Sequence, residues 1–587
     1  MHMLGDLPLE EHDVIDQLAL ALIILGLVWV LIFTRLPPPR AFVGAMVACY
    51  LLGFIDTQTV LSKSVNQGVV TLVLLLLISV GLERLPWLAS LGQRLVTPSL
   101  PKSLVRLSVV TAVFSAFVNN TAVVATLASS LRKNNVHPAS RLLLPLSYAA
   151  ILGGTLTLIG TSTNLIVSSF VQDQTGTPLP FLAFFPVALP ALLVGLLTMF
   201  LFNHRLPAHS QEFERVEEYL LEAEIEDSSS MIGKTVQDNN LRDLGGLFLV
   251  QIVREGHLIA PVAPTQRIVS GDKLIFSGDV KRVALLERFD GLKLFALEEG
   301  LLQGSMTEVV IRPNAAIVGR TIKEVSFRSR FDAAVVGMKR DGERLSGKLG
   351  GIVVQPGDSL VLATGPDFLN RNNLDRNFLL VDTDIEGRSM PSGLSIGLTL
   401  WVGLMLALAA LGVLPLLKGL ALTLGIMLLT GAVSTTELRR RLPWELWLII
   451  TSALAIAQAI NNTGAVATLV AWGQPWLSLL SPLALLAVIY FLTLALTELM
   501  TNNAAAALMF PLAWALSQSA GVDPAPIIMG VAFGASASFL TPYGYTTNLM
   551  VQNLGGYQKM DYFRFGLPLS VVYSAVVLFL IPSAFPF

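Results

Sequence analysis

Long apolar stretches separated by short polar segments fill both ends of the chain and leave a polar middle. A helix that spans a bilayer needs about 20 mainly apolar residues. Such spans are predicted near residues 17–34, 40–58, 68–83, 142–171, 181–203, 393–412, 415–432, 443–460, 525–552 and 565–586. Two more segments, near 103–131 and 470–517, are apolar but interrupted by polar residues. Each end therefore contains three spans, one interrupted segment and two spans, which predicts an α-helical polytopic membrane protein.

The charged residues divide this pattern into three parts. Only 14% of the 587 residues are charged, and 51 of the 80 charged residues lie between Arg205 and Arg388. Soluble proteins usually carry about 25% charged residues, so this distribution argues against a soluble enzyme. We expect a first transmembrane half at 1–204, a cytosolic insert at 205–390 and a second transmembrane half at 391–587. The net charge of −2 argues against a generally basic nucleic-acid binder.

Lysine and arginine positions predict the orientation in the membrane, because cytoplasmic loops carry an excess of these residues. They flank the 103–131 segment on both sides, at Arg84, Arg94, Lys102, Arg106, Arg132, Lys133 and Arg141. Both ends of that segment are then cytoplasmic, which predicts a re-entrant hairpin, and 470–517 is predicted to be its counterpart entering from outside. The insert is then cytoplasmic and both termini are extracytoplasmic. Five crossings in each half give the halves opposite topology, an inverted repeat typical of secondary transporters.

The two membrane halves also share sequence motifs. The first half contains Asn119-Asn120-Thr121 and, downstream, GTSTNLIV from Gly160. The second contains Thr501-Asn502-Asn503 and, downstream, GYTTNLMV from Gly544. Asn120 and Asn164 are 44 residues apart, and Asn503 and Asn548 are 45 residues apart. Two motifs that keep one spacing indicate an internal repeat.

The insert contains a second, separate repeat. MIGKTVQDNNLR from Met231 matches IVGRTIKEVSFR from Ile317, and Gly271-Asp272 matches Gly357-Asp358, both at a distance of 86 residues. Each copy combines β-branched runs with Gly-Asp turns, which favours strands and tight turns. The insert is therefore predicted to hold two small α+β modules, at about 217–295 and 303–372.

The polar motifs inside apolar segments are the candidate chemistry. Broken helices at the middle of a membrane are tolerated where they line a cavity. Their amino-terminal ends suit an anion, and carbonyl, Asn and Thr oxygens suit a hard cation such as sodium. The alternative is that Asn and Thr only form hydrogen bonds between helices. Glu498, three residues before Thr501, is predicted to brace the second hairpin or to carry a proton.

At these motifs the chain resembles the divalent anion/sodium symporter family over both membrane halves, roughly 400 residues. The resemblance implies substrate between two hairpin tips, a sodium ion at each tip, a homodimer and an elevator-type movement. The implied substrate-binding residues are Asn119, Asn120, Thr121, Thr163, Asn164, Thr501, Asn502, Asn503, Thr547 and Asn548. The implied sodium sites lie near Asn120, Gly160, Thr161 and Asn164, and near Asn503, Thr541, Gly544 and Asn548. The insert resembles paired TrkA-C modules, the C-terminal halves of potassium-conductance regulators.

Several functional alternatives stay open at this point. The family signature is Ser-Asn-Thr, and the departures at Asn119, Thr501 and Asn503 favour a compact divalent anion, sulfate first, over a dicarboxylate or citrate. Coupling to protons through Glu498, a ligand-gated channel and a receptor that does not transport are the rivals. The modules are expected either to bind a regulatory nucleotide or other small ligand, or to scaffold a dimer. The sequence shows no phosphate-binding loop, zinc-ligand spacing or nucleophile-elbow motif, so no enzyme is expected.

Overall fold

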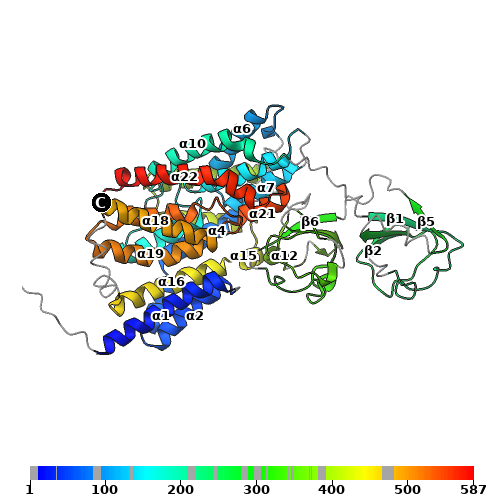
Figure 1. The fold of residues 1–587 in the computed structure, drawn as a ribbon, viewed down its shortest axis with the longest axis horizontal. Helices are drawn as coiled ribbons and strands as arrows, with labels where there is room; N and C mark the ends of the chain where they lie inside the picture. The colour runs from blue at the N-terminus through cyan, green and yellow to red at the C-terminus, as the bar shows by residue number, and fades with distance from the viewer. Residues whose placement is uncertain are drawn as a thin grey trace, which may run out of the picture.

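Figure 1 shows the fold in a computed structural model. The structure describes residues 11–34, 36–82, 94–132, 136–208, 220–241, 247–254, 257–278, 289–295, 306–312, 315–340, 343–345, 349–365, 367–368, 371, 373–380, 392–465 and 481–587. Residues 470–480 of the second predicted hairpin segment lie outside the described residues. The same is true of Arg84 and Lys133, two of the cations used to predict orientation.

Apolar helices make up the first end of the chain. They are α1 (Glu11–Phe33), α2 (Pro38–Leu51), α3 (Thr57–Ser64), α4 (Gln67–Leu82), α6 (Leu100–Ser115), α7 (Asn120–Arg132), α8 (Leu143–Gly154), α9 (Ser162–Thr175) and α10 (Phe185–Phe202). Several breaks between them have local causes. Asp56 caps α3, because its carboxylate accepts a hydrogen bond from the backbone N–H of Thr59 at 2.7 Å. Gly176 ends α9 with a left-handed φ of 77°.

The second end of the chain repeats this order of helices within the described residues. Its helices are α13 (Ser392–Ala410), α14 (Leu416–Leu429), α15 (Thr435–Arg441), α16 (Trp444–Asn462), α18 (Pro482–Leu499), α19 (Asn502–Ser519), α20 (Pro524–Ser536), α21 (Thr546–Gly555) and α22 (Lys559–Ala584). The packing partners correspond as well. Helix α2 packs on α16 and α14 on α4, α6 packs on α8 and α18 on α20, and α9 packs on α19 and α21 on α7. The two ends are therefore interleaved in one helical body.

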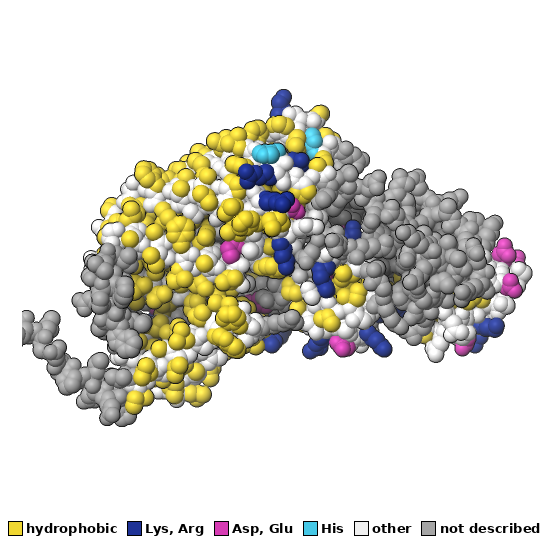
Figure 2. All heavy atoms as spheres, in the orientation of Figure 1, with side chains coloured by type: hydrophobic (Ala, Val, Ile, Leu, Met, Phe, Trp, Pro, Cys, Tyr) yellow, Lys and Arg dark blue, Asp and Glu magenta, His cyan; other side chains and the backbone are white. Residues whose placement is uncertain are grey.

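The helical body has the surface and the helix lengths of a membrane protein. Six segments of the described chain are long and apolar enough to cross a bilayer: Ile15–Phe33, Thr57–Leu82, Phe185–Arg205, Trp444–Asn462, Pro482–Leu499 and Lys559–Ala584. On the face shown in Figure 2, hydrophobic side chains cover the helical body, and Lys and Arg side chains gather where that body meets the insert. The prediction of a multi-pass α-helical membrane protein is confirmed.

The described part of the insert contains two five-stranded antiparallel sheets of the same topology. Its strands are β1 (Leu220–Ile225), β2 (Leu247–Arg254), β3 (His257–Ile259), β4 (Lys273–Gly278), β5 (Leu292–Phe295), β6 (Met306–Ile311), β7 (Ala333–Arg340), β8 (Glu343–Arg344), β9 (Ser359–Thr364) and β10 (Phe378–Leu380). The order β3-β2-β4-β1-β5 in the first sheet matches β8-β7-β9-β6-β10 in the second. Each sheet contributes to a hydrophobic core of its own. In Figure 1 the sheet that contains β6 lies beside the helical body, and the sheet that contains β1 lies beyond it.

Each sheet is also locked by the same ion pair. Arg254 Nε donates to Asp272 Oδ1 at 2.7 Å, and Arg340 Nε donates to Asp358 Oδ1 at 2.8 Å. Both aspartate side chains are fully buried. The aspartate of the predicted Gly-Asp turn therefore fastens the turn to the neighbouring strand in both copies. A sheet-containing insert is confirmed by these strands, and its assignment to the TrkA-C class stays a prediction.

Candidate functional site

The repeated motifs lie at the amino-terminal ends of four helices inside the helical body. Helix α7 begins at Asn120 and α19 at Asn502, each directly after a break that follows α6 or α18. Helix α9 begins at Ser162 and α21 at Thr546, so GTSTNLIV and GYTTNLMV run into the first turns of these two helices. Helix beginnings expose backbone N–H groups and the positive end of the helix dipole, which suits a negatively charged ligand. The contacts of α9 with α19 and of α21 with α7 bring each of these helices beside a segment of the opposite half that is predicted to form a re-entrant hairpin.

The first tip is held by a chain of hydrogen bonds that crosses between the halves. Asn120 accepts a hydrogen bond at Oδ1 from the Ser115 hydroxyl, and its Nδ2 donates to the Tyr545 hydroxyl at 2.8 Å. The Tyr545 hydroxyl also lies 2.9 Å from Thr161 Oγ1. All four side chains are buried. Asn120 and Thr161, both predicted site residues, are thus joined through Tyr545 of the other half.

The second tip has a corresponding but simpler bond between halves. Ser162 Oγ donates to Asn503 Oδ1 at 2.6 Å. Thr501 caps α19, with its hydroxyl accepting from the backbone N–H of Ala504 at 3.4 Å. Asn502 also acts locally, because its Oδ1 accepts from the backbone N–H of Asn503 at 3.0 Å. Among the described contacts, Asn503 is therefore the one predicted residue at this tip whose side chain bonds across to the other half.

Asn164 and Asn548 hold the broken segments together. Asn164 Nδ2 donates to the carbonyl oxygen of Thr157 at 2.9 Å, and Asn548 Nδ2 donates to that of Ser538 at 2.9 Å. Both asparagines are almost completely buried. Each amide therefore bridges a helix beginning to the non-helical stretch that precedes it. The structure gives these two predicted residues a positioning role at the loop.

The neighbouring threonines bond to serines of the opposite half. Ser147 in α8 lies 2.9 Å from Thr547 Oγ1 and donates to Asn548 Oδ1 at 2.7 Å. Thr163 Oγ1 lies 2.7 Å from Ser536 Oγ at the end of α20. Sequence reasoning missed a set of partners that complete the site: Ser115, Ser147, Ser162, Ser536 and Tyr545. Ser162 and Tyr545 lie inside the repeated motifs and could have been found there, whereas the other three carry no local signal.

Carbonyl and hydroxyl oxygens lie close to the two motif glycines. A Cβ atom on Gly160 would collide with the carbonyl oxygen of Gly154, at the end of α8, and would lie 2.9 Å from that of Ser115, at the end of α6. A Cβ atom on Gly544 would collide with the carbonyl oxygen of Thr497, in the last turn of α18, and with the Ser538 hydroxyl, just past α20. The negative ends of two helices therefore meet at Gly160, and the negative end of α18 meets a serine hydroxyl at Gly544. Both arrangements attract a cation.

Two further observations bear on the cation class. The Ser538 hydroxyl is fully buried and has no hydrogen-bond partner among the described residues. The described part of the chain contains no group of three His, Cys, Asp or Glu side chains that could hold a metal ion. The oxygens closest to the two glycines belong to neutral carbonyl and hydroxyl groups. A hard monovalent cation fits that donor set, whereas a tightly held transition metal prefers imidazole or thiolate ligands.

Glu498 lies in α18 five residues before Asn503, the same offset that separates Ser115 from Asn120. Its Oε1 accepts hydrogen bonds from the backbone N–H groups of Phe539 at 2.9 Å and Leu540 at 2.8 Å. Its Oε2 accepts from the Thr541 hydroxyl at 2.7 Å. Three donors thus converge on one carboxylate and tie α18 to the broken segment. These contacts are those expected of a bracing residue, and the choice between bracing and proton transfer stays a prediction.

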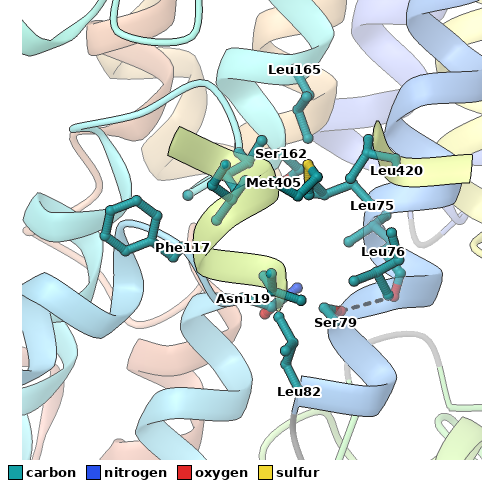
Figure 3. Close-up of a pocket in the computed structure, with 15 residues that line it drawn as sticks. Leu75, Leu76, Ser79, Leu82, Phe117, Asn119, Ser162, Leu165, Met405 and Leu420 are labelled. Atoms are coloured by element: carbon teal, nitrogen blue, oxygen red, sulfur yellow. Dashed lines mark hydrogen bonds between the residues drawn. The ribbon is translucent and has the colours of Figure 1, made fainter. Parts of the chain in front are cut away.

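A small cavity adjoins the first tip (Figure 3). It has a volume of about 30 Å³, and its polar lining includes Asn119, Ser162 and Ser79 of α4. The rest of the lining is mainly apolar and includes Leu75 of α4 and Met405 of α13. Asn119 Oδ1 accepts from the backbone N–H of Thr121 at 2.9 Å, so both residues belong to the capped start of α7. A water molecule needs about 10–15 Å³ in such a measure, so the cavity has room for only about two.

Comparison with known proteins places the chain in a family. A model described as the citrate transporter family matches residues 27–529. The chain belongs to the citrate transporter family. This transporter is 34% identical to the "Putative sulfur deprivation response regulator" of Chlamydomonas reinhardtii, over 89% of this chain and 94% of that protein. It is 28% identical to an uncharacterised transporter of Synechocystis, over 94% of this chain and 95% of that protein.

A third relative has a named transport activity. Sodium/sulfate cotransporter 2 of Chlamydomonas reinhardtii is 29% identical over 60% of this chain and 42% of that longer protein. The family and these relatives confirm that the chain is a membrane transporter and not an enzyme. The homodimer, the opposite topology of the halves and the membrane orientation stay predictions.

Proposed function

We propose that this transporter is a secondary active symporter that couples sodium ions to a divalent anion, most favourably sulfate, by an elevator-type alternating-access mechanism. The observation that carries the proposal is the pair of oxygen clusters at Gly160 and Gly544. Carbonyl oxygens from the ends of α8 and α6 converge at Gly160, and a carbonyl oxygen from the last turn of α18 converges with the Ser538 hydroxyl at Gly544. Unwound backbone and the C-terminal ends of half-helices are typical sodium ligands in transporters of this design.

Electrostatics supports coupling of the anion to cations. Among the described residues, the hydrogen-bond partners of the motif side chains include no Lys, Arg or His. A divalent anion at the beginnings of α7, α9, α19 and α21 would therefore be balanced by helix dipoles and by co-bound cations. Helix dipoles alone contribute about 0.3–1 kcal/mol each near a surface and up to about 2 kcal/mol when partly buried. Two bound sodium ions would neutralise the anion's charge and make its burial far less costly.

The proposed orientation places the insert in the cytoplasm. Arg141 Nη1 donates to the carbonyl oxygen of Asn203 at 2.7 Å, and Arg205 Nη1 donates to that of Arg564 at 3.4 Å. Three arginines from the starts of α8 and α22 and the end of α10 thus gather at one end of the helical body. Figure 2 shows Lys and Arg side chains where that body meets the insert. The positive-inside rule then makes this the cytoplasmic side.

A second candidate function is transport of citrate or a dicarboxylate. The matching family favours it, since that family is described as citrate transporter. The named sodium/sulfate relative favours sulfate. The tips lean the same way, because in the described residues Asn119 and Thr501 act as local caps, while Asn120 and Asn503 are the tip residues that bond across the halves. A proton-coupled carrier is a weaker candidate, because three hydrogen-bond donors tie the Glu498 carboxylate to the broken segment. A channel and a receptor without transport stay rivals that transport measurements distinguish from a symporter.

Regulation by the insert has a physical route into the site. Asn553 Nδ2, near the end of α21, donates to the carbonyl oxygen of Gly357 in the turn before β9. Leu549 of α21 packs against the same glycine. Helix α21 begins two residues before Asn548, so a movement of this turn would act on the helix that forms the second site. The insert is proposed to regulate transport through this contact.

The deciding experiment is uptake of radiolabelled sulfate into proteoliposomes that contain the full chain, with and without an inward sodium gradient. Unlabelled succinate, citrate and bicarbonate serve as competitors, and an inward proton gradient without sodium is the control. Sodium-driven accumulation that succinate leaves intact is the expected result. Carboxylate uptake without sulfate uptake would replace the substrate. Uptake driven by the proton gradient alone would replace the coupling ion, and sulfate binding without counterflow would make the protein a receptor.

A further inference from the structure

The internal repeat places residues of very different size at one equivalent position. In GTSTNLIV the residue after the glycine is Thr161, and in GYTTNLMV it is Tyr545. Each is the residue directly before a helix, α9 or α21, and both have extended backbone conformations. The two local backbones therefore correspond. The two positions therefore differ in side-chain volume and not in backbone conformation.

The Tyr545 ring spans the gap between the second broken segment and the first hairpin tip. Its hydroxyl receives the Asn120 Nδ2 hydrogen bond at 2.8 Å and lies 2.9 Å from Thr161 Oγ1. The residue is 7% exposed, so its ring lies inside the body. Because the hydroxyl is fixed at the first tip while the backbone belongs to the second half, the rigid ring must fill the space between them. That space is where an anion between the two tips would bind.

We propose that Tyr545 is a specificity-determining residue that limits the size of the anion. The inference rests on the proposed function. A tetrahedral oxyanion concentrates its charge around one central atom and fits beside the ring. A dicarboxylate or citrate separates its carboxylates along a carbon chain and needs the space that the ring occupies. The cavity beside Asn119 and Ser162 is about 30 Å³, so the adjoining region does not offer replacement room in this conformation.

The hydroxyl has a separate role that an experiment can distinguish from that of the ring. It holds the Asn120 amide nitrogen, which leaves Asn120 Oδ1 turned toward Ser115. Loss of the hydroxyl alone disturbs the oxygen arrangement at the first tip but keeps the volume. Loss of the ring opens the site. Tyr545→Phe therefore tests the hydroxyl, and Tyr545→Thr, which installs the residue of the first repeat, tests the ring.

The experiment measures sodium-driven sulfate uptake by the full chain in proteoliposomes, with succinate and citrate as competitors. We expect Tyr545→Thr to lower the succinate concentration that halves sulfate uptake by about tenfold or more, the scale on which pocket volume discriminates substrates. Tyr545→Phe keeps succinate excluded and raises the half-saturating sodium concentration by about fivefold to tenfold, because a buried donor loses its partner. Tyr543→Phe is the matched control, since Tyr543 is 49% exposed in the same loop.

The outcomes separate this inference from the proposed function. If the unsubstituted chain does not transport sulfate with sodium, the proposed function fails. If it does and Tyr545→Thr retains the competitor profile of the unsubstituted chain, the size limit by Tyr545 is refuted. Should Tyr545→Thr be inactive, thermal stabilisation of the purified full chain by sulfate or succinate gives the answer. If succinate stabilises Tyr545→Thr but not the unsubstituted chain, the inference is supported. If sulfate stabilises Tyr545→Thr and succinate does not, the inference is overturned.

Discussion

A pair of equivalent glycines provides a matched test of the contact between the insert and the helical body. Gly271 and Gly357 occupy the same turn in the two modules, 86 residues apart, with φ angles of 76° and 83°. A Cβ atom on Gly271 would meet no atom within 4 Å. A Cβ atom on Gly357 would lie 2.7 Å from Leu549 Cδ1 and 3.0 Å from Leu549 Cγ. Gly271→Ala and Gly357→Ala therefore differ only in what they do to α21.

The difference between the two variants can be estimated from the structure. Both place alanine in the left-handed region, which costs about 1–2 kcal/mol and cancels in the comparison. Only Gly357→Ala also forces a methyl group into a packed leucine, and overpacking of this kind typically costs about 1–3 kcal/mol. A coupling energy of that size changes an equilibrium by about 5-fold to 150-fold. Gly357→Ala should therefore weaken the docking of the turn on α21 by such a factor.

The assay compares initial rates of sodium-driven sulfate uptake by the full chain at sodium concentrations below half-saturation. We expect Gly271→Ala to stay within about twofold of the unsubstituted chain, because single surface turns act locally. Gly357→Ala should lower the rate about fivefold or more. The Gly357 turn would no longer hold α21, and Asn548 at the start of that helix would be less well positioned. The melting temperature of each purified variant controls for general destabilisation.

Two results would refute this reasoning. Equal loss of transport in both variants would show that the turn matters only for the fold of the insert. Unchanged transport in Gly357→Ala, with an unchanged melting temperature, would show that the turn does not pack on α21. Asn553→Ala is an independent check, because it removes the hydrogen bond to Gly357 without strain in the turn.

The remaining predictions concern the tips, the buried acid and the insert. Asn120→Ala and Asn503→Ala should each raise the half-saturating sodium concentration about tenfold while expression and dimerisation stay intact, and a sodium response equal to that of the unsubstituted chain in both would disprove the site assignment. Glu498→Gln should lower the melting temperature, because the carboxylate loses part of its bracing, while sodium-driven uptake stays. If the unsubstituted chain shows proton-driven uptake and Glu498→Gln loses it, Glu498 couples transport to protons instead. Arg340→Ala should destabilise its module by about 3–5 kcal/mol, measured as a lower melting temperature, because Asp358 would stay buried without its cation.

The sequence could predict the elements of this fold where the pattern is local. The 86-residue repeat anticipates the two sheets, since β1 and β6 begin at equivalent positions and the Gly-Asp turns precede β4 and β9. The Asn motifs were likewise visible, because polar residues stand out in apolar segments. The different contacts that the residues of each motif make could not be predicted. Asn119 and Thr501 cap helices locally, while Asn120 and Asn503 bond across the halves, and nothing in the motif itself separates these roles.

Contacts between distant segments lay beyond sequence reasoning for a physical reason. Tyr545 and Asn120 are 425 positions apart, and their bond exists only because α21 packs on α7. The contact of Gly357 with Asn553 likewise depends on how the insert sits on the helical body. Composition and spacing constrain which segments form helices or strands, whereas tertiary packing decides which polar ends meet.

The two candidate cation sites are built on the same plan but differ in charge, and this difference bears on the mechanism. At the first site the residue five positions before the tip asparagine is the neutral Ser115, which bonds directly to Asn120. At the second site it is Glu498, whose carboxylate is directed to the backbone of the broken segment. When this carboxylate is ionised, its negative charge strengthens the attraction of the second site for a cation, while the first site depends on dipoles alone. The second site should therefore fill at lower sodium concentration, and occupancy of the first, which Tyr545 joins to the other half, should be the step that limits transport when sodium is scarce.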